Sequence, residues 1–343
     1  MNGPLSQPLN GDDRCEVAII GAGIAGMYAV YSCGMGGLDS ILVEATETPG
    51  GQCMALYAEK ALYGVPGQYG ERAGNFAEKM SNECLQYARR TYLGCFVDEI
   101  ERTEETDEFL IRFKDQATGH IHVVSAKHLI IATGVGRMTP CVPSAMSGLE
   151  HIDPRSDFVQ YYRMQRDFYT GKVVVIVGGG DSAADCAMMA ADAARSVVLM
   201  HKKPKLVCEA AKIAQIERLQ QSSKLSIALN YQIVEIREAD SKRLIVARNA
   251  EEMDITIEVD HVVFCCGFVV NNGMLAMFRN LGLEIEDNLI KIDINTMATS
   301  VKNCYAVGDV VTYANKKKSI VPCLFEADRA VRIIRNARIR SFQ

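Results

Sequence analysis

Two glycine-rich turns are the residues of this chain whose types and spacing point most directly to chemistry. Residues 21–26 read Gly-Ala-Gly-Ile-Ala-Gly, and residues 178–183 read Gly-Gly-Gly-Asp-Ser-Ala. In such turns the first glycine permits a tight bend, the second lets the backbone approach a pyrophosphate, and the third position lets a helix pack on its strand. The helix that follows would direct free N–H groups and its positive dipole end at the phosphates. The glycines that we expect to bind dinucleotides are Gly21, Gly23 and Gly26 in the first turn, and Gly178 and Gly180 in the second.

The segments around both turns repeat one plan. Each turn follows a short apolar run and precedes an apolar or alanine-rich stretch and a second apolar run, which predicts a strand–turn–helix–strand unit twice. Alternating apolar and β-branched residues then predict further strands at 95–99, 109–113, 121–125 and 128–131, and again at 225–236, 243–247, 255–258 and 261–264. The predicted fold class is α/β, with two Rossmann-like nucleotide-binding domains of the three-layer ββα type.

Composition supports an ordinary globular protein of two domains. The chain has 343 residues, of which 48% are hydrophobic and 23% charged. It contains no run of 18 apolar residues, so no membrane-spanning helix is predicted. The net charge of −5 argues against a dedicated nucleic-acid binder, which needs a broad basic surface. The twelve cysteines form no disulfide framework and favour a reducing compartment, so we expect the cytoplasm. Residues 1–14 are polar and predict a flexible tail.

The residue after the second strand of each unit distinguishes the two nucleotides. Glu44 follows Gly26 by 18 positions, and a carboxylate there would accept hydrogen bonds from an adenosine ribose and repel a 2′-phosphate. At the same offset after Ala183 the chain reads His201-Lys202-Lys203, whose charges suit a 2′-phosphate. The first site is therefore predicted to bind FAD or NAD and the second NADP. A solvated strand end is the alternative explanation for the lysines.

Two further segments favour a flavin in the first site. The segment 49–72 makes the first unit longer than the second, and its Gln52, Tyr57 and Tyr63 could supply amide hydrogen bonds and a stacking face. A simple loop elaboration is the alternative. Near the C-terminus an apolar strand ends in Gly308-Asp309, and the aspartate could hydrogen-bond ribityl hydroxyls. Pro322 then predicts the first position of a helix.

Together these motifs resemble those of the thioredoxin-reductase-like flavoproteins over essentially the whole chain. The segment PGGQ-x-x-ALY-x-EK, at residues 49–60, is similar to that of the ferredoxin–NADP reductases of this type. The resemblance implies an NADPH-binding domain at 138–267, inserted into a discontinuous FAD-binding domain at 15–137 and 268–343. Thioredoxin reductases carry a redox Cys-x-x-Cys, and this sequence contains none, which excludes disulfide reduction by that route.

The resemblance also implies an activity. NADPH would reduce one bound FAD per chain by hydride transfer to flavin N5, and electrons would leave singly to a ferredoxin, an acidic iron–sulfur protein. No side chain is needed as an acid or base, no metal is expected, and the protein would be a homodimer without nucleic-acid or membrane partners. The implied FAD residues are Glu44, Gln52, Tyr57 (stacked on the isoalloxazine), Val97, Met138 and Asp309; the implied NADPH residues are Asp181, Ser182, His201, Lys202 and Lys203.

Departures from the family pattern leave rival functions open. Relatives carry arginines where this chain has its two lysines and Val207, and a glycine-bearing stretch where it has residues 320–326. No counterpart is evident to the C-terminal residue that covers the second flavin face in relatives. The rivals are an NAD(P)H oxidase, a flavodoxin reductase, and a sensor module that binds both nucleotides without turnover.

Several other polar residues have a structural and a functional explanation. Arginines recur at 329, 332, 335 and 338, which is typical of a solvated helix face but also suits docking of an acidic ferredoxin. Adjacent Cys265 and Cys266 are predicted to be core residues, as are Cys53 and Cys323. The six histidines lack metal-ligand spacing.

Overall fold

The computed structural model describes residues 14–103, 105–141, 146–152, 156–239, 242–271 and 273–340, without the side chains of 137–140, 239, 268–271 and 340. The chain forms two compact units: unit 1 comprises Met1–Arg137 and Val270–Gln343, and unit 2 comprises Met138–Val269. Residues 1–13 of the predicted tail lie outside the described residues, and Arg14 already begins the first strand.

Unit 1 is built on a seven-stranded mixed sheet. Its parallel part runs β3-β2-β1-β6, and β5 and β4 continue antiparallel from β6. The parallel strands β1 and β2 are nearly continuous apolar runs because both faces of the sheet are covered. The strands are β1 (Arg14–Ile20), β2 (Ser40–Val43), β3 (Arg90–Tyr92), β4 (Cys95–Arg102), β5 (Phe109–Asp115), β6 (Ile121–Ile131) and β19 (Cys304–Ala306).

Strand β6 joins the two parts of this sheet. Its first half pairs with β5 up to Ala126, and its last three residues pair in parallel with β19. The prediction of separate strands at 121–125 and 128–131 was wrong, because the sheet partner changes within one continuous strand. The C-terminal part of the chain therefore completes the sheet begun by the N-terminal part.

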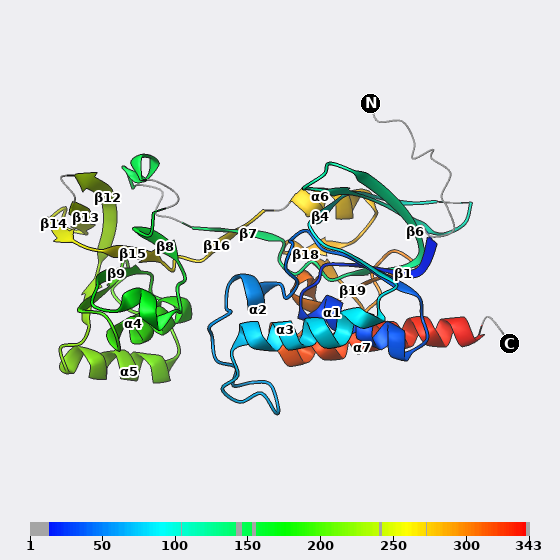
Figure 1. Cartoon of the computed structure of the whole chain (residues 1–343), viewed down its shortest axis with the longest axis horizontal. Helices are drawn as coiled ribbons and strands as arrows, with labels where there is room; N and C mark the ends of the chain where they lie inside the picture. The colour runs from blue at the N-terminus through cyan, green and yellow to red at the C-terminus, as the bar shows by residue number, and fades with distance from the viewer. Residues whose placement is uncertain are drawn as a thin grey trace. The chain divides into compact units, whose positions relative to one another are not determined.

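Helices α1 (Ile24–Met35), α3 (Ala73–Cys84) and α7 (Ile320–Arg340) of unit 1 pack together with the parallel strands, and Figure 1 shows the three helices side by side. The buried face of α7 consists of Ala327, Ala330, Val331 and Ile334, all in the same core cluster as α1. The helix begins at Ile320, two residues earlier than Pro322 predicted, so the proline lies in the first turn, where its missing N–H is not needed. The helices and remaining strands of unit 1 are α1 (Ile24–Met35), α2 (Gln52–Ala55), α3 (Ala73–Cys84), α6 (Gly273–Asn280), α7 (Ile320–Arg340), β17 (Ile285–Glu286), β18 (Leu289–Lys291) and β20 (Val311–Thr312).

Unit 2 repeats the strand–turn–helix plan on a parallel sheet of order β11-β10-β9-β15-β8, with a separate antiparallel sheet β12-β13-β14. The predicted strand at 225–236 is two strands, because Asn230 takes a left-handed conformation (φ 62°) between them. The elements are β8 (Val159–Tyr161), β9 (Val173–Val177), α4 (Asp181–Ala191), β10 (Ser196–His201), α5 (Ala210–Gln221), β11 (Ser226–Leu229), β12 (Tyr231–Ala239), β13 (Lys242–Asn249), β14 (Asp254–Glu258) and β15 (His261–Phe264).

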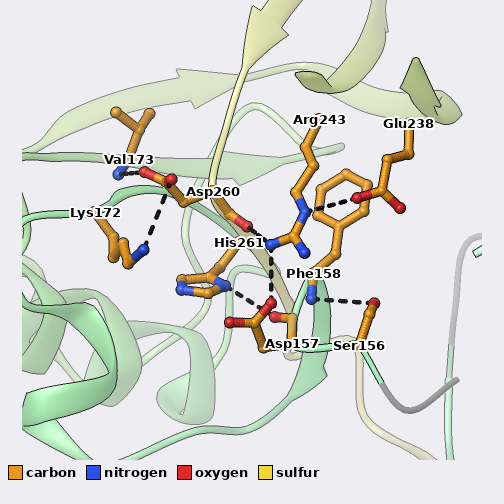
Figure 2. Close-up of polar contacts among 9 residues, drawn as sticks. All are labelled: Ser156, Asp157, Phe158, Lys172, Val173, Glu238, Arg243, Asp260 and His261. Carbon is orange, nitrogen blue, oxygen red and sulfur yellow. Dashed lines mark hydrogen bonds and ion pairs between the residues drawn. The ribbon is translucent and has the colours of Figure 1, made fainter. Parts of the chain in front are cut away.

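A polar cluster ties the two sheets of unit 2 together at the amino ends of β9 and β15 (Figure 2). Arg243 of β13 donates to Asp157 Oδ1 over 2.8 Å, to Glu238 Oε1 over 3.0 Å and to the main-chain oxygen of Asp260 over 3.1 Å. Asp260 Oδ2 accepts the Val173 N–H at 2.7 Å. The cluster lies at the end of β9 opposite Gly178, so the strand is fixed at the end away from the glycine turn.

The chain crosses between the units twice, and the crossing segments pair with each other. Strand β7 (Arg137–Pro140) and strand β16 (Phe268–Asn271) form a two-stranded sheet. The first crossing falls at Arg137, and the chain returns to unit 1 at Val270.

Candidate functional site

The first glycine turn is shaped by close backbone packing. Gly21 has a φ of +103°, and a β-carbon there would lie 2.5 Å from the carbonyl oxygen of Ala132. A β-carbon on Gly26 would lie 1.8 Å from the carbonyl oxygen of Gly21. Gly23 differs, because the nearest atom to its β-carbon would be 3.9 Å away, and it begins α1 without a side-chain cap. The helix N-terminus thus retains donors for an anionic group.

Glu44 is held at the end of β2 beside this turn. Its Oε2 accepts the Ala22 N–H at 2.6 Å, and its Oε1 accepts the Thr46 N–H and hydroxyl, both at 2.8 Å. A cavity of about 180 Å³ adjoins the residue after Glu44 and is lined by Ala45, Glu47, Leu93, Gly94, Asp115, Gln116 and Ala117. The sequence-predicted carboxylate is therefore fixed at the carboxyl end of the sheet, next to an open space.

The PGGQ segment packs directly on the glycine turn. A β-carbon on Gly51 would fall 2.8 Å from the α-carbon of Gly23, and Gly51 has a φ of +54°. This close approach requires glycine and places Gln52 at the start of α2. Gln52 Nε2 donates to Asp309 Oδ2 over 2.8 Å, although the residues are 257 positions apart. The structure thus brings together two residues that the sequence assigned to one flavin site.

The turn that carries Asp309 is supported by a residue that the sequence reasoning missed. Glu326 of α7 is fully buried, and its Oε2 accepts the Gly308 N–H at 2.8 Å. A signal existed in the sequence: Glu326 occupies the apolar stripe of α7 between Cys323 and Ala330, where a charge needs a partner.

Cys53 and Cys323 flank Asp309 as protonated thiols. Cys323 Sγ lies 3.9 Å from Asp309 Oδ1. Burial, followed by the charge of Asp309, raises the pKa of Cys323 to about 12 and that of Cys53 to about 11. Because the thiolate is the reactive form, neither group is poised as a nucleophile at neutral pH. Their prediction as packing residues agrees with this environment.

The remaining predicted FAD residues are placed differently. Tyr57 is half-buried, its N–H donates to the Gln52 carbonyl at 3.1 Å, and Lys60 Nζ lies 5.6 Å from its ring centroid. Val97 is buried in the core of unit 1. Tyr63 is 70% exposed and packs edge-on against Tyr69. The side chain of Met138 lies outside the described residues.

A larger cavity of unit 1 lies beside the residue that follows Asp309. It has a volume of about 350 Å³, and Val310, Lys318 and the end of β6 contribute to its wall. Its lining residues are Thr133, Gly134, Val135, Gly136, Met274, Leu275, Phe278, Asp287, Asn288, Leu289, Val310 and Lys318.

The second glycine turn, in unit 2, has a histidine packed against it. Gly178 has a φ of +145°, and a β-carbon there would lie 2.4 Å from the Cys265 carbonyl oxygen. A β-carbon on Gly179 would fall 2.5 Å from the His201 ring, whereas one on Gly180 would meet nothing within 4 Å. His201 is 9% exposed, and its Nε2 has no hydrogen-bond partner in the described part of the chain. Burial and the two following lysines lower its pKa. An unsatisfied buried nitrogen beside a glycine turn fits a polar ligand.

Asp181, the first residue of α4, connects the start of this helix to the start of α5. Its Oδ1 accepts the Glu209 N–H at 3.1 Å and lies 3.3 Å from Lys212 Nζ. The Val207 N–H donates to the Gly179 carbonyl at 2.7 Å. Lys202 and Lys203 are exposed at the end of β10, and Ser182 is half-exposed on α4. The predicted NADPH residues of unit 2 therefore surround one turn.

The adjacent cysteines of unit 2 do not share one environment. Cys265 Sγ lies 3.7 Å from Cys186 Sγ beneath the second turn. Cys266 is exposed, so the prediction that both are core residues was wrong for Cys266. Alternation along the strand end turns neighbouring side chains to opposite sides. Within the described ranges no group of three metal-ligating side chains occurs.

Comparisons with known proteins agree over nearly the whole chain. Residues 15–337 match the family described as pyridine nucleotide-disulphide oxidoreductase. A ferredoxin–NADP reductase of Thermus thermophilus is 34% identical over 90% of this chain and 88% of its own length. One of Acidiphilium cryptum is 32% identical over 93% and 91%.

Solved structures show the fold. A thioredoxin reductase of T. acidophilum superposes with a TM-score of 0.74, at 22% identity, covering 95% of this chain and 99% of its own. A thioredoxin reductase of Lactococcus lactis gives the same values. The predicted α/β class is thus confirmed. Among the described helices, none is long and apolar enough to cross a membrane.

Proposed function

The chain belongs to the pyridine nucleotide-disulphide oxidoreductase family, and we propose that it works as a ferredoxin–NADP reductase with FAD in unit 1 and NADPH in unit 2. Curated relatives of that name match about nine-tenths of both chains. The sequence lacks a Cys-x-x-Cys, so the disulfide chemistry suggested by the fold neighbours has no counterpart here.

The residues of unit 1 fit FAD. The open N-terminus of α1 at Gly23 suits the pyrophosphate, and the carboxylate of Glu44 suits the adenosine ribose. Gln52 and Asp309 would contact the ribityl chain and flavin, and Tyr57 would stack on the isoalloxazine. FAD supplies the hydride and single-electron chemistry when bound. The further proposed contacts are Gly21, Gly26, Val97 and Met138.

The residues of unit 2 fit NADPH. Gly178 makes the tight turn, Gly180 leaves the backbone open to the pyrophosphate, and Asp181 and Ser182 lie at the helix start. His201 offers its unpartnered Nε2 as a donor, while Lys202 and Lys203 place charge where a 2′-phosphate would lie. These groups bind and orient the nucleotide, and none needs to exchange a proton with it.

The Gln52–Asp309 hydrogen bond is the single observation that carries this proposal. It unites the PGGQ segment and the Gly308-Asp309 turn beside the first glycine turn, which is the arrangement that one flavin would bridge. The partner would be an acidic iron–sulfur ferredoxin, and the protein would act as a homodimer in the cytoplasm. All twelve cysteines are free thiols, which supports a reducing compartment.

Anaerobic stopped-flow reduction of the FAD-loaded protein tests the proposal. NADPH should bleach the flavin absorbance more efficiently than NADH, and ferredoxin should restore it. Reoxidation by oxygen but not ferredoxin would instead identify an oxidase, and reoxidation by flavodoxin alone a flavodoxin reductase. If neither nucleotide bleaches the flavin, the reductase function is contradicted and the sensor module becomes the leading function.

A further inference from the structure

Glu326 and Lys316 form a buried ion pair directly behind the flavin-side turn. The Glu326 side chain is fully buried and that of Lys316 is 6% exposed, and Lys316 Nζ contacts Glu326 Oε1. The Tyr313 hydroxyl donates to the same oxygen at 2.7 Å, and the Gly308 N–H donates to Oε2 at 2.8 Å. In the described part of the chain, the Glu326 carboxyl contacts only donor groups, which is the pattern of a carboxylate.

The pair supports a turn whose backbone conformation favours glycine. Gly308 has a φ of +84°, and a β-carbon there would lie 3.1 Å from Ala25 Cβ in α1. Glu326 fixes the Gly308 amide, and the next residue, Asp309, then reaches Gln52. Loss of the Gly308 contact would release the turn that presents Asp309.

Burying these two charged groups costs free energy unless each charge is balanced by the other. Removing one partner of a buried ion pair leaves an uncompensated charge in a medium of low dielectric, where its field acts over longer range than in water. The Glu326 carboxylate is hydrogen-bonded to the amide of Gly308, which is the residue before Asp309. Charge near a flavin changes how readily the flavin accepts electrons.

We propose that Glu326 and Lys316 are positioning residues that present Asp309 to FAD and that their charge balance sets the reduction potential of the bound flavin. This inference rests on the proposed binding of FAD in unit 1. It predicts that neutralising Glu326 and neutralising Lys316 shift the flavin reduction potential in opposite directions, which a purely structural role would not produce.

The first measurement uses four variants of the full-length protein loaded with FAD and determines the reduction potential of the bound flavin against a reference dye at pH 8. Glu326→Gln leaves Lys316 positive, so the potential should rise. Lys316→Met leaves Glu326 negative, so the potential should fall. The double variant Glu326→Gln/Lys316→Met should return close to the wild-type value. Tyr313→Phe removes a donor without changing charge and should leave the potential unchanged.

Shifts of the same sign in both single variants, or a wild-type potential in FAD-loaded Glu326→Gln, would overturn the inference. If Glu326→Gln does not retain FAD, Lys316→Met decides by the sign of its shift, and an upward or absent shift rejects the proposal. Titration of the apoproteins with FAD gives a second readout, because both single variants should bind FAD at least tenfold more weakly and Lys316→Arg should restore binding. Wild-type protein that binds no FAD would refute the proposed function itself. Inactive protein with the expected flavin potentials would refute only the assignment of ferredoxin as partner or of NADPH as electron donor.

Discussion

The amide of Gln52 is hydrogen-bonded to the carboxylate of Asp309 over 2.8 Å, and so links the start of α2 to the turn that precedes α7. The contact is partly buried and charge-assisted, which is worth about 1.5–3 kcal/mol. Gln52→Ala should therefore weaken FAD binding about 10- to 100-fold, as measured by quenching of flavin fluorescence during titration of the apoprotein. Gln86→Ala is the matched control, because the exposed Gln86 donates to the carbonyl of Glu83, far from the proposed site in sequence. Equal FAD affinities for the two variants would refute the assignment.

Gly180→Ala should separate nucleotide binding from folding. Gly180 has a φ of −93°, which alanine adopts freely, and a β-carbon there meets no protein atom within 4 Å. Loss of unfolded-state freedom should leave stability unchanged or raise it by about 0.4–1 kcal/mol. The methyl group would occupy the proposed pyrophosphate space, so calorimetry should show NADPH affinity reduced at least tenfold. Gly179→Ala, which clashes with His201, should instead lower both stability and affinity. Undiminished NADPH binding by Gly180→Ala would place the phosphates elsewhere.

Lys202 and Lys203 should account for the preference for NADPH over NADH. Each makes a charge-assisted contact in the proposal, so each change to alanine should raise the Michaelis constant for NADPH about tenfold and leave that for NADH unchanged. The effect should weaken as salt increases, because exposed charges are screened. Lys205→Ala, in the same exposed run, is the control. A parallel loss with NADH would mean that the lysines serve the structure and not the 2′-phosphate.

His261 should make unit 2 less stable in mild acid. The ring is 1% exposed, stacks on Phe168 at 4.1 Å and has Nδ1 2.8 Å from the Asp157 carbonyl oxygen (Figure 2). Burial lowers its pKa from 6.5; Asp157 and Asp260 oppose this effect, and Lys172 adds to it. The unfolded chain therefore takes up the proton first as pH falls, so stability is complete above about pH 6.5 and decreases down to the lower folded-state pKa.

The melting temperature measured between pH 8 and pH 5 checks this expectation. His261→Gln should show a shallower decline than the wild type. His151→Gln, at an exposed position, should follow the wild-type curve. Identical slopes for wild type and His261→Gln would show that other groups, such as the half-buried His128, cause the pH dependence.

The basic residues just before α7 and those in its C-terminal half should differ in their effect on ferredoxin binding. Arg338 contacts Glu16 and the Gly37 carbonyl, and Arg332 pairs with Asp328, which is the behaviour of a solvated helix face. Arg335 also lies twelve residues, or about 18 Å of helix, beyond Cys323 and its contact with Asp309. Exposed Lys317 and Lys318 instead lie near the proposed flavin site, and Lys318 lines the larger cavity of unit 1.

Charge reversal tests this contrast in ferredoxin reduction at low ionic strength. Lys317→Glu with Lys318→Glu should raise the Michaelis constant for ferredoxin about tenfold by opposing electrostatic steering, and ferricyanide reduction should stay unchanged. Arg332→Glu with Arg335→Glu should change neither the Michaelis constant for ferredoxin nor the rate of ferricyanide reduction. The reverse result would move the docking surface to the C-terminal half of the helix.

The sequence predicts the repeated units well because each depends on local signals. Glycine spacing, apolar runs and strand alternation are determined within about 30 residues, and both turns lie where these patterns predicted. Strand β6 was divided in error because the change of partner from β5 to β19 depends on residues far away in sequence. Glu326 was missed for the same reason, since its partners Gly308, Tyr313 and Lys316 approach only when α7 packs. Gln52 and Asp309 were both expected at the flavin, but their direct contact follows from tertiary packing alone.

Strand β6 also constrains the order in which the protein can mature during synthesis. It ends at Ile131, and its parallel neighbour β19 begins at Cys304, after the whole of unit 2 has been translated. At about 5–20 residues per second, the ribosome needs roughly 9 to 35 s to cover that interval. During this period unit 2 is translated to its end, while the last three residues of β6 still lack their parallel partner β19. The protein should therefore depend on chaperones mainly for its N-terminal segment, and should acquire FAD only after the last helix has left the ribosome.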